Sequence, residues 1–397
     1  MLVNLKSFKT VASLALIFIF NCFLATLFSY YKALKLQSYK SIKYFYAILI
    51  LFVSVYNSTK VPENDLEWIV ELFNDAEKYP LSIYITLLTG GKEILYCVIS
   101  YLLYFICGGN DQLFVFSLSF ISYSALFAAL FSFNKAIAAP KVVFLTSVLT
   151  MAFFPYSFAL SVHIVRQFMG TCLCIWGVVG YICYHRRSSR IVALIVAILS
   201  IFVHTSVGFF IPLLFLPFLK ASVNRKNVFL YGVLMITIFS FTIIANYLLP
   251  YFEDSVLSYG LDKLAEGTTF ETHIPTIQLL FVSVTTIVGL VFFYSCSALK
   301  HVPIACLMMN INLLIYIFVI TNISLNIEMS LRYLFDILIL LPFIVSILFY
   351  KISNKFIHIL LSLILFIFWS FYNMTLSEWT YKCSDYFPMY TIFNYIV

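Results

Sequence analysis

The stretch Ser161–Gly170 has the sequence SVHIVRQFMG and lies between two strongly apolar regions. Arg166 is in its middle, and His163 precedes Arg166 by about one helical turn. A guanidinium at the edge of a bilayer is costly, so such a group usually faces a cavity and has a function there. The stretch therefore predicts a functional arginine on an otherwise hydrophobic, membrane-embedded scaffold.

The composition of the whole chain is that of a membrane protein. Of its 397 residues, 63% are hydrophobic and only 10% are charged, and the mean hydropathy is +1.01. We therefore expect an all-α, polytopic integral membrane protein, with a single membrane domain over residues 1–397. The net charge of +7 then reports membrane orientation, and we expect membrane lipids and no nucleic acid as partners.

Apolar runs recur along the chain at the length that a bilayer requires. A spanning helix needs about 20 apolar residues, and hydropathy on that basis predicts about 12 transmembrane helices. The predicted spans are Val11–Tyr30, Ile42–Tyr56, Leu113–Phe133, Val142–Ser161, Gln167–Tyr184, Ile191–His204, Val207–Leu219, Val228–Leu249, Thr276–Ser297, Val302–Thr321, Tyr333–Tyr350 and Phe356–Thr375.

The short apolar run Ile94–Cys107 decides the topology. Lys and Arg accumulate in cytoplasmic loops, and most basic loops would face outward if this run crossed the membrane. We therefore expect a re-entrant or in-plane element within an outer loop over residues 57–112. The same topology predicts a second outer loop at 250–275 and an outer C-terminal tail at 376–397. It places five polar residues on the outer side: Asp65, Glu93, Arg166, His204 and Arg332.

The sequence gives no indication of a metal or cofactor site. Most of the nine cysteines lie in or beside apolar runs, where cysteine behaves as a small hydrophobic residue. The chain has no Walker loop, dinucleotide glycine fingerprint, HExxH or GxSxG motif. We expect no cofactor, no metal and no disulfide.

Each of the two outer arginines has two interpretations. Arg166 either extends to lipid headgroups or presents a fork to a diphosphate, which guanidinium binds in bidentate fashion. Arg332 either pairs with Glu328 or Asp336, each one helical turn away, or supplies a second phosphate ligand. We favour phosphate binding for both arginines.

The other outer polar residues have similar alternatives. Glu93 either caps the helix that follows it, where the dipole favours a carboxylate, or serves as a general base or sugar ligand. His204 is either a core histidine or a group that acts as a base or binds a sugar hydroxyl. Asp65 and Trp68 belong either to a solvated helix face or to a carbohydrate platform on which Trp68 stacks against sugar rings.

Taken together, these residues resemble the pattern of the EpsG/Wzy-type polysaccharide polymerases. The motifs that carry the resemblance are Glu93 before an apolar run, the pair Arg166-Gln167 opening a span, the triplet His204-Thr205-Ser206, the late pair Arg332-Tyr333, and Asp65 at the place of the family's earlier acidic residue. The likeness covers most of the chain, from about Asp65 to Tyr333.

The resemblance implies a metal-independent glycosyltransferase of the bacterial inner membrane, an O-antigen polymerase of lipopolysaccharide biosynthesis whose active face is periplasmic. Its substrate would be a polyprenyl-diphosphate-linked oligosaccharide, and its partners the chain-length regulator and the flippase of the same pathway. The implied catalytic residues are Glu93, His204, Arg166 and Arg332. The implied substrate-binding residues are Asp65, Trp68, His163, Gln167, Ser206 and Tyr333.

Two other functions fit a chain of this composition. A lipid-linked oligosaccharide flippase should show two similar halves and cationic residues along a central cavity, and the sequence shows neither. An O-antigen ligase usually has a larger polar loop late in the chain, whereas Thr321–Arg332 is short. We therefore favour the polymerase.

Overall fold

The computed structural model describes residues 13–63, 65–89, 93–155, 158, 161, 163–224, 227–234, 236–237, 240, 276–323 and 327–371. These residues form helices and connecting turns, with no β-strand among them, which confirms the all-α prediction. The predicted outer loop at 250–275 and the predicted tail at 376–397 lie outside the described residues. The chain divides into two compact units, Met1–Ile211 with Phe349–Val397, and Pro212–Leu348, and each is described by itself.

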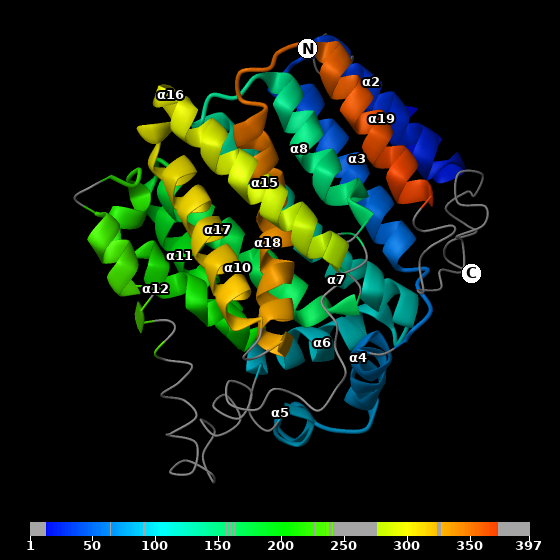
Figure 1. Cartoon of the computed structure of the whole chain (residues 1–397). Coiled ribbons are helices and arrows are strands. Elements are labelled where there is room, and N and C mark those ends of the chain that lie inside the picture. Colours follow the sequence, from blue (N-terminus) through cyan, green and yellow to red (C-terminus); the bar gives the residue numbers. More distant parts are fainter. Residues whose placement is uncertain are drawn as a thin grey trace. The chain divides into compact units, whose positions relative to one another are not determined.

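The first unit is a bundle of apolar helices that carries a group of shorter helices (Figure 1). The bundle helices are α2 (Cys22–Leu36), α3 (Tyr39–Asn57), α7 (Asp111–Ala136), α8 (Lys141–Phe153), α10 (Val165–Cys183), α11 (Arg187–Leu199) and α19 (Lys355–Phe371). The shorter elements are α4 (Asp65–Asn74), η1 (Asp75–Glu77), α5 (Leu81–Thr89), α6 (Ile94–Cys107), η2 (Ser200–Phe202) and η3 (Thr205–Phe209).

Local capping explains where several of these helices begin. Asn21 and Asn110 accept hydrogen bonds from the backbone N–H groups of Leu24 and Leu113 at the starts of α2 and α7. Ser38 and Ser41 form a reciprocal capping box at the start of α3. These side chains satisfy N–H groups that a helix leaves unpaired in its first turn, so they set the short connections between the bundle helices.

The bundle of the first unit has a basic end and an acidic end. Nζ of Lys43 in α3 lies 5.1 Å from the ring centroid of Phe131 near the end of α7, and Asn57 at the other end of α3 donates to Ser119 near the start of α7. The two helices are therefore antiparallel. The residues at the basic end are Lys35, Lys40, Lys43, Lys135, Lys141, Arg186, Arg187, Arg190 and Lys355. The opposite end is the acidic end, which carries Asp65, Glu67, Glu71, Asp75 and Glu77 of α4 and η1.

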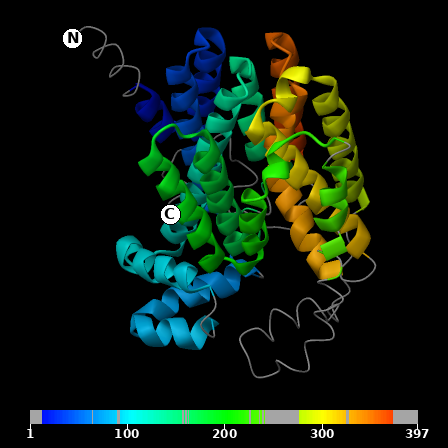
Figure 2. The same cartoon turned by 90° about the vertical axis from the view of Figure 1, so that its left-hand side faces the viewer.

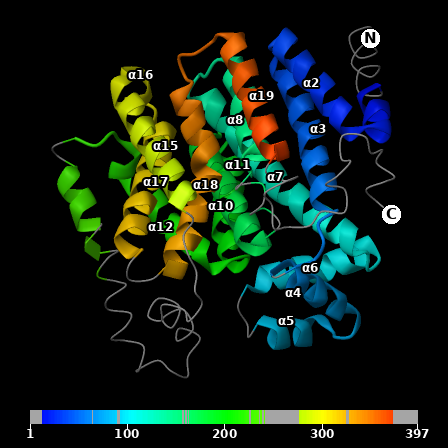
Figure 3. The same cartoon turned by 45° about the vertical axis from the view of Figure 1, so that its right-hand side comes forward.

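The antiparallel arrangement also places the chain between α3 and α7. Because α3 ends and α7 begins at the same end of the bundle, residues 58–110 leave and return on one side. Figures 2 and 3 show α4, α5 and α6 gathered at that end, lying across the direction of the longer helices. Helix α6 has 14 residues, or about 21 Å at 1.5 Å per residue. Its place in a membrane stays a prediction.

A cluster of aromatic rings holds the acidic end together. The Trp369 ring in α19 has an exposure of 0% and packs against Phe52 and Tyr56 of α3 at centroid distances of 6.4 and 5.2 Å. It also packs against Phe153 and Phe158, at 5.2 and 5.4 Å. Such aromatic pairs add to the hydrophobic contribution of their buried area. This packing holds Phe158, which lies between α8 and α10 in the sequence, against Tyr56 and Trp369.

Two glycines allow α10 and α11 to pack closely. A Cβ atom on Gly177 would lie 2.6 Å from the Ala193 carbonyl oxygen and 2.7 Å from the Ala197 Cβ. A Cβ atom on Gly180 would lie 2.9 Å from the Ala193 Cβ. Only glycine fits at such a distance from a neighbouring backbone. The close contact orients α11, and thereby the residues that follow it.

The second unit contains the late apolar helices. Its elements are η4 (Pro217–Lys220), α15 (Thr276–Ser295), α16 (Ser297–Lys300), α17 (Pro303–Asn322) and α18 (Ile327–Leu348). The buried amides of α17 connect them, because Asn310 donates to the Leu219 and Ala221 carbonyl oxygens and Asn312 donates to Thr286 Oγ1.

Six described helices are long and apolar enough to cross a membrane: Tyr39–Asn57, Asp111–Ala136, Val165–Cys183, Gln278–Ser295, Pro303–Asn322 and Ser330–Leu348. Each coincides with one of the predicted spans, and the remaining predicted spans stay predictions. The run predicted over Val207–Leu219 differs, because it forms the short pieces η3, α12 (Phe210–Leu214) and η4. Pro212 and Pro217 lack a backbone N–H, which disfavours one continuous helix here.

The close packing of α10 against α11 is testable through Gly177→Ala. Alanine normally stabilises a helix by about 1 kcal/mol relative to glycine, but its Cβ would meet the Ala193 carbonyl oxygen at 2.6 Å. We expect a net destabilisation of about 1–3 kcal/mol, typical of overpacking, measured by thermal unfolding of the detergent-solubilised protein. Gly232→Ala is the control, because nothing lies within 4 Å of its Cβ position. Equal melting temperatures for both variants would contradict the close contact.

Candidate functional site

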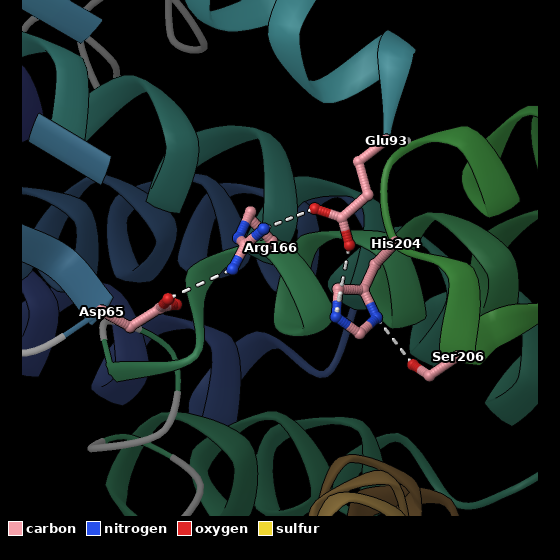
Figure 4. A network of polar contacts seen from close by, with 5 residues as sticks. All are labelled: Asp65, Glu93, Arg166, His204 and Ser206. Atoms are coloured by element: carbon pink, nitrogen blue, oxygen red, sulfur yellow. Dashed lines mark hydrogen bonds and ion pairs between the residues drawn. The ribbon is translucent and has the colours of Figure 1, made fainter. Parts of the chain in front are cut away.

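Five polar residues meet at the acidic end of the first unit: Asp65, Glu93, Arg166, His204 and Ser206 (Figure 4). We call them the polar cluster. Asp65 is the first residue of α4, Glu93 immediately precedes α6, and Arg166 lies in the first turn of α10. His204 lies between η2 and η3, with Ser206 two residues later. The structure thus brings together residues from four separate segments.

Arg166 is the centre of the polar cluster. Its Nη1 donates to Glu93 Oε2 at 2.6 Å, and its Nη2 donates to Asp65 Oδ1 at 3.3 Å. The guanidinium therefore forms a bridge between two carboxylates rather than standing alone. A cation at a helix N-terminus is disfavoured by the helix dipole, so the two carboxylates compensate an unfavourable position as well as a partly buried charge.

The backbone of Glu93 has an unusual conformation. Its φ of 51° and ψ of 36° are left-handed, and its side chain makes no capping hydrogen bond to α6. A non-glycine residue in this region costs about 1–3 kcal/mol and persists where the surroundings enforce it. Glu93 is thus the N-cap residue of α6 without a side-chain capping hydrogen bond. The left-handed backbone instead accompanies a carboxylate that is directed to Arg166 and His204.

His204 extends the network beyond Glu93. Its Nε2 lies 3.5 Å from Glu93 Oε1, and its Nδ1 lies 2.7 Å from Ser206 Oγ. The residue is buried, and its extended backbone, with φ of −154°, ends the helical path of α11 and η2. A Cβ atom on Gly170 of α10 would lie 3.1 Å from the His204 Cβ, so this glycine helps the histidine approach. The result is a Ser206–His204–Glu93 chain suited to holding or moving a proton.

Trp68 adds an aromatic face to the polar cluster. The Arg166 Cζ lies 4.6 Å from the centroid of the Trp68 ring, which is a cation–π contact. Trp68 is one helical turn after Asp65 in α4 and is 38% exposed. Asp65 and Trp68 thus belong to a partly exposed helix face that also contacts Arg166. Stacking of Trp68 on a sugar stays a prediction.

Lys60 and His163 form a second group of polar residues outside the membrane helices. The Lys60 side chain is buried, with Nζ 3.8 Å from Glu63 Oε2, and burial lowers the Lys60 pKa. Burial also lowers the pKa of His163, and the positive charge of Lys60 lowers it further. Sequence reasoning missed Lys60, whose only signal was a lysine directly after an apolar run with a glutamate three residues later.

Two buried residues near the polar cluster, Asn57 and Tyr96, were also not identified from the sequence. Asn57 Nδ2 donates to Ser119 Oγ at 3.2 Å and to Ser161 Oγ at 3.0 Å, which connects the chain before α10 to α3 and α7. Tyr96, in the first turn of α6, has an exposure of 0%. An asparagine or tyrosine within an apolar run carries no recognisable pattern, so the sequence could not single them out.

The remaining residues that the sequence predicted lie elsewhere. Gln167 is buried in α10 beside Arg166. Arg332 and Tyr333 lie on α18 in the second unit, and the fully buried Asp336 follows Arg332 by one turn. Their roles stay predictions. Among the described residues, no group of three or more His, Cys, Asp or Glu side chains could hold a metal ion.

The fold defines the class of this chain as a helical, multi-pass membrane protein, and the polar cluster lies at one end of a helix bundle. Residues 43–396 match the EpsG family, and the chain belongs to this family of polysaccharide polymerase-like membrane proteins. The match confirms the resemblance seen in the sequence. Comparison with the curated proteins and with the solved structures found no match.

His163 predicts a pH dependence of stability. Its pKa is lowered on folding, so below about pH 6.5 the unfolded chain takes up a proton more readily than the folded protein does. Stability should therefore fall as the pH drops below this value. We expect His163→Gln to reduce this acid sensitivity in thermal unfolding between pH 7.5 and 5. His185→Gln, at an exposed residue of the opposite end, should keep the wild-type profile. Identical profiles for all three proteins would contradict the inference.

Proposed function

We propose that this chain is an O-antigen polymerase, a glycosyltransferase that moves a glycan from polyprenyl diphosphate onto a lipid-linked repeat unit during lipopolysaccharide biosynthesis. The observation that carries the proposal is the Glu93 carboxylate, held between Arg166 at 2.6 Å and His204 at 3.5 Å, in a member of the EpsG family. The proposed location is the bacterial inner membrane, with the polar cluster on the periplasmic face. The segregation of basic residues to the opposite end of the bundle supports this orientation.

In the proposed reaction, an acceptor hydroxyl oxygen bonds to the anomeric carbon of the donor glycan. The bond from that carbon to the diphosphate oxygen breaks, and its electron pair leaves with the diphosphate. The hydroxyl proton goes to Glu93 as general base, whose carboxylate is held in place by Arg166 at 2.6 Å. His204, oriented by Ser206, lies on the other carboxylate oxygen and can stabilise either protonation state.

The net charge of the polar cluster favours binding of the acceptor glycan over binding of the diphosphate. Asp65 and Glu93 bring two negative charges against the single positive charge of Arg166, so with a neutral His204 the polar cluster is negative by one unit. Carboxylates accept hydrogen bonds from sugar hydroxyls but repel a diphosphate. We therefore assign the polar cluster, with Trp68, to the acceptor glycan.

The diphosphate of the donor needs positive charge from another residue. Arg332 is the candidate, with Tyr333 beside it, because a guanidinium fork matches phosphate oxygens. Arg166 would bind the diphosphate only if it released Glu93 and Asp65 when the donor binds. Gln167 and His163, both close to Arg166 in sequence, complete the proposed substrate-binding set.

The geometry of this site fits the two alternative functions less well. A flippase moves its substrate without chemistry and needs no carboxylate paired with a histidine. An O-antigen ligase shares the donor but transfers to a different acceptor, and only an assay separates it from the polymerase. The proposed partners are the lipid-linked oligosaccharide, membrane lipids, and the chain-length regulator and flippase of the same pathway. We propose no nucleic-acid partner.

The first test is the lipopolysaccharide ladder of a deletion strain complemented with variants at matched protein levels. We expect Glu93→Gln to lower elongation by about 100-fold or more, as loss of a general base does, and Arg166→Ala to abolish the ladder. One repeat unit should still be attached to the core. Glu71→Gln is the control, because Glu71 is exposed on α4 and outside the polar cluster. Complete loss of attached sugar in the deletion strain would indicate the ligase or the flippase instead.

A second test separates the acceptor and donor sides. The purified protein is given lipid-linked repeat units as donor and repeat-unit oligosaccharide released from its lipid as acceptor. We expect Asp65→Asn to raise the acceptor KM about 10-fold, so that excess acceptor restores the rate, because Asp65 holds Arg166 at 3.3 Å. Arg332→Ala should not respond to excess acceptor. Rescue of Arg332→Ala by acceptor, or of Asp65→Asn by donor alone, would contradict this division.

A further inference from the structure

Tyr96 and Tyr84 are two buried tyrosines of neighbouring short helices with different surroundings. Both side chains have an exposure of 0%. The Tyr84 hydroxyl in α5 donates to Ser100 Oγ at 3.1 Å. The Tyr96 hydroxyl has no hydrogen-bond partner in the part of the chain that the structure describes. A buried hydroxyl without a partner is destabilising, and such a group in a native protein calls for an explanation.

Three charged groups of the polar cluster act electrostatically on the Tyr96 hydroxyl. They are the guanidinium of Arg166 and the carboxylates of Asp65 and Glu93, and the Tyr84 hydroxyl acts on it as well. Tyr96 follows Glu93 by three residues, so both lie at the same N-terminal turn of α6. Tyr96 therefore lies in the first turn of α6, which directly follows Glu93 of the polar cluster.

Tyr96 is less exposed than the three charged residues of the polar cluster. The side chain of Asp65 is 31% exposed, that of Arg166 25% and that of Glu93 11%, whereas Tyr96 is at 0%. The hydroxyl is therefore shielded from water as well as unpartnered among the described residues.

We propose that the Tyr96 hydroxyl binds the acceptor glycan, by donating a hydrogen bond to a sugar oxygen next to the hydroxyl that reacts at Glu93. This inference rests on the proposed polymerase function and adds a substrate contact to it. A phenol is protonated at neutral pH, since it titrates near pH 10 in water, so it is a donor where Glu93 and Asp65 can only accept. The three groups together would match a sugar, whose oxygen atoms both donate and accept hydrogen bonds.

The test compares Tyr96→Phe with Tyr84→Phe in the full-length purified protein. Removing an unpartnered buried hydroxyl should leave the melting temperature of Tyr96→Phe equal to or above that of wild type, because no protein hydrogen bond is lost. Its acceptor KM should rise about 3- to 10-fold, the effect of one lost hydrogen bond, with an unchanged donor KM. Tyr84→Phe should lower the melting temperature through loss of the Ser100 contact and leave the acceptor KM unchanged.

Three results would overturn the inference. An unchanged acceptor KM in Tyr96→Phe means that the hydroxyl does not touch the acceptor. A melting temperature that falls together with activity means that the tyrosine is structural. A wild-type protein that does not elongate lipid-linked repeat units at all refutes the polymerase function, and this inference with it. The wild-type rate thus tests the function, and the ratio between Tyr96→Phe and wild type tests the residue.

Discussion

The bridge from Arg166 to Glu93 and Asp65 is the interaction on which the site depends. Three partly buried charges cannot be held singly at the end of an apolar bundle, because each would lack compensation. Joined at 2.6 and 3.3 Å, they compensate one another and hold the starts of α4, α6 and α10 in one place. The short helices between α3 and α7 are therefore part of the site, since they supply both carboxylates.

Packing contacts within the first unit help to position the residues of this bridge. Trp369 packs against Phe153 and Phe158. Asn57 donates a hydrogen bond to Ser161. Gly177 lets α11 approach α10 closely enough to place His204 beside Glu93. Each of these contacts lies outside the polar cluster, yet each helps to determine where one member of the polar cluster lies.

The geometry changes the expected role of Arg166. A lone arginine at the outer face suggested a ligand for a diphosphate, whereas an arginine between two carboxylates, with a neutral His204, leaves the polar cluster with a net charge of minus one. Such a site suits a neutral, hydroxyl-rich acceptor and a proton transfer to Glu93. In our proposal, positive charge for the leaving diphosphate comes from Arg332, so the two arginines have separate tasks in one glycosyl transfer.

The sequence by itself determined the all-α membrane class, the six long apolar helices and the polar residues on which the site is built, because hydropathy and charge are properties of local runs. It also pointed to the EpsG family. Only the tertiary structure decided that Arg166 binds Glu93 and Asp65, that the Glu93 side chain makes no capping hydrogen bond to α6, and that Lys60 lies near His163. Arg166 is 73 and 101 residues from these two carboxylates. Contacts over such separations depend on how the helices pack, which no local pattern encodes.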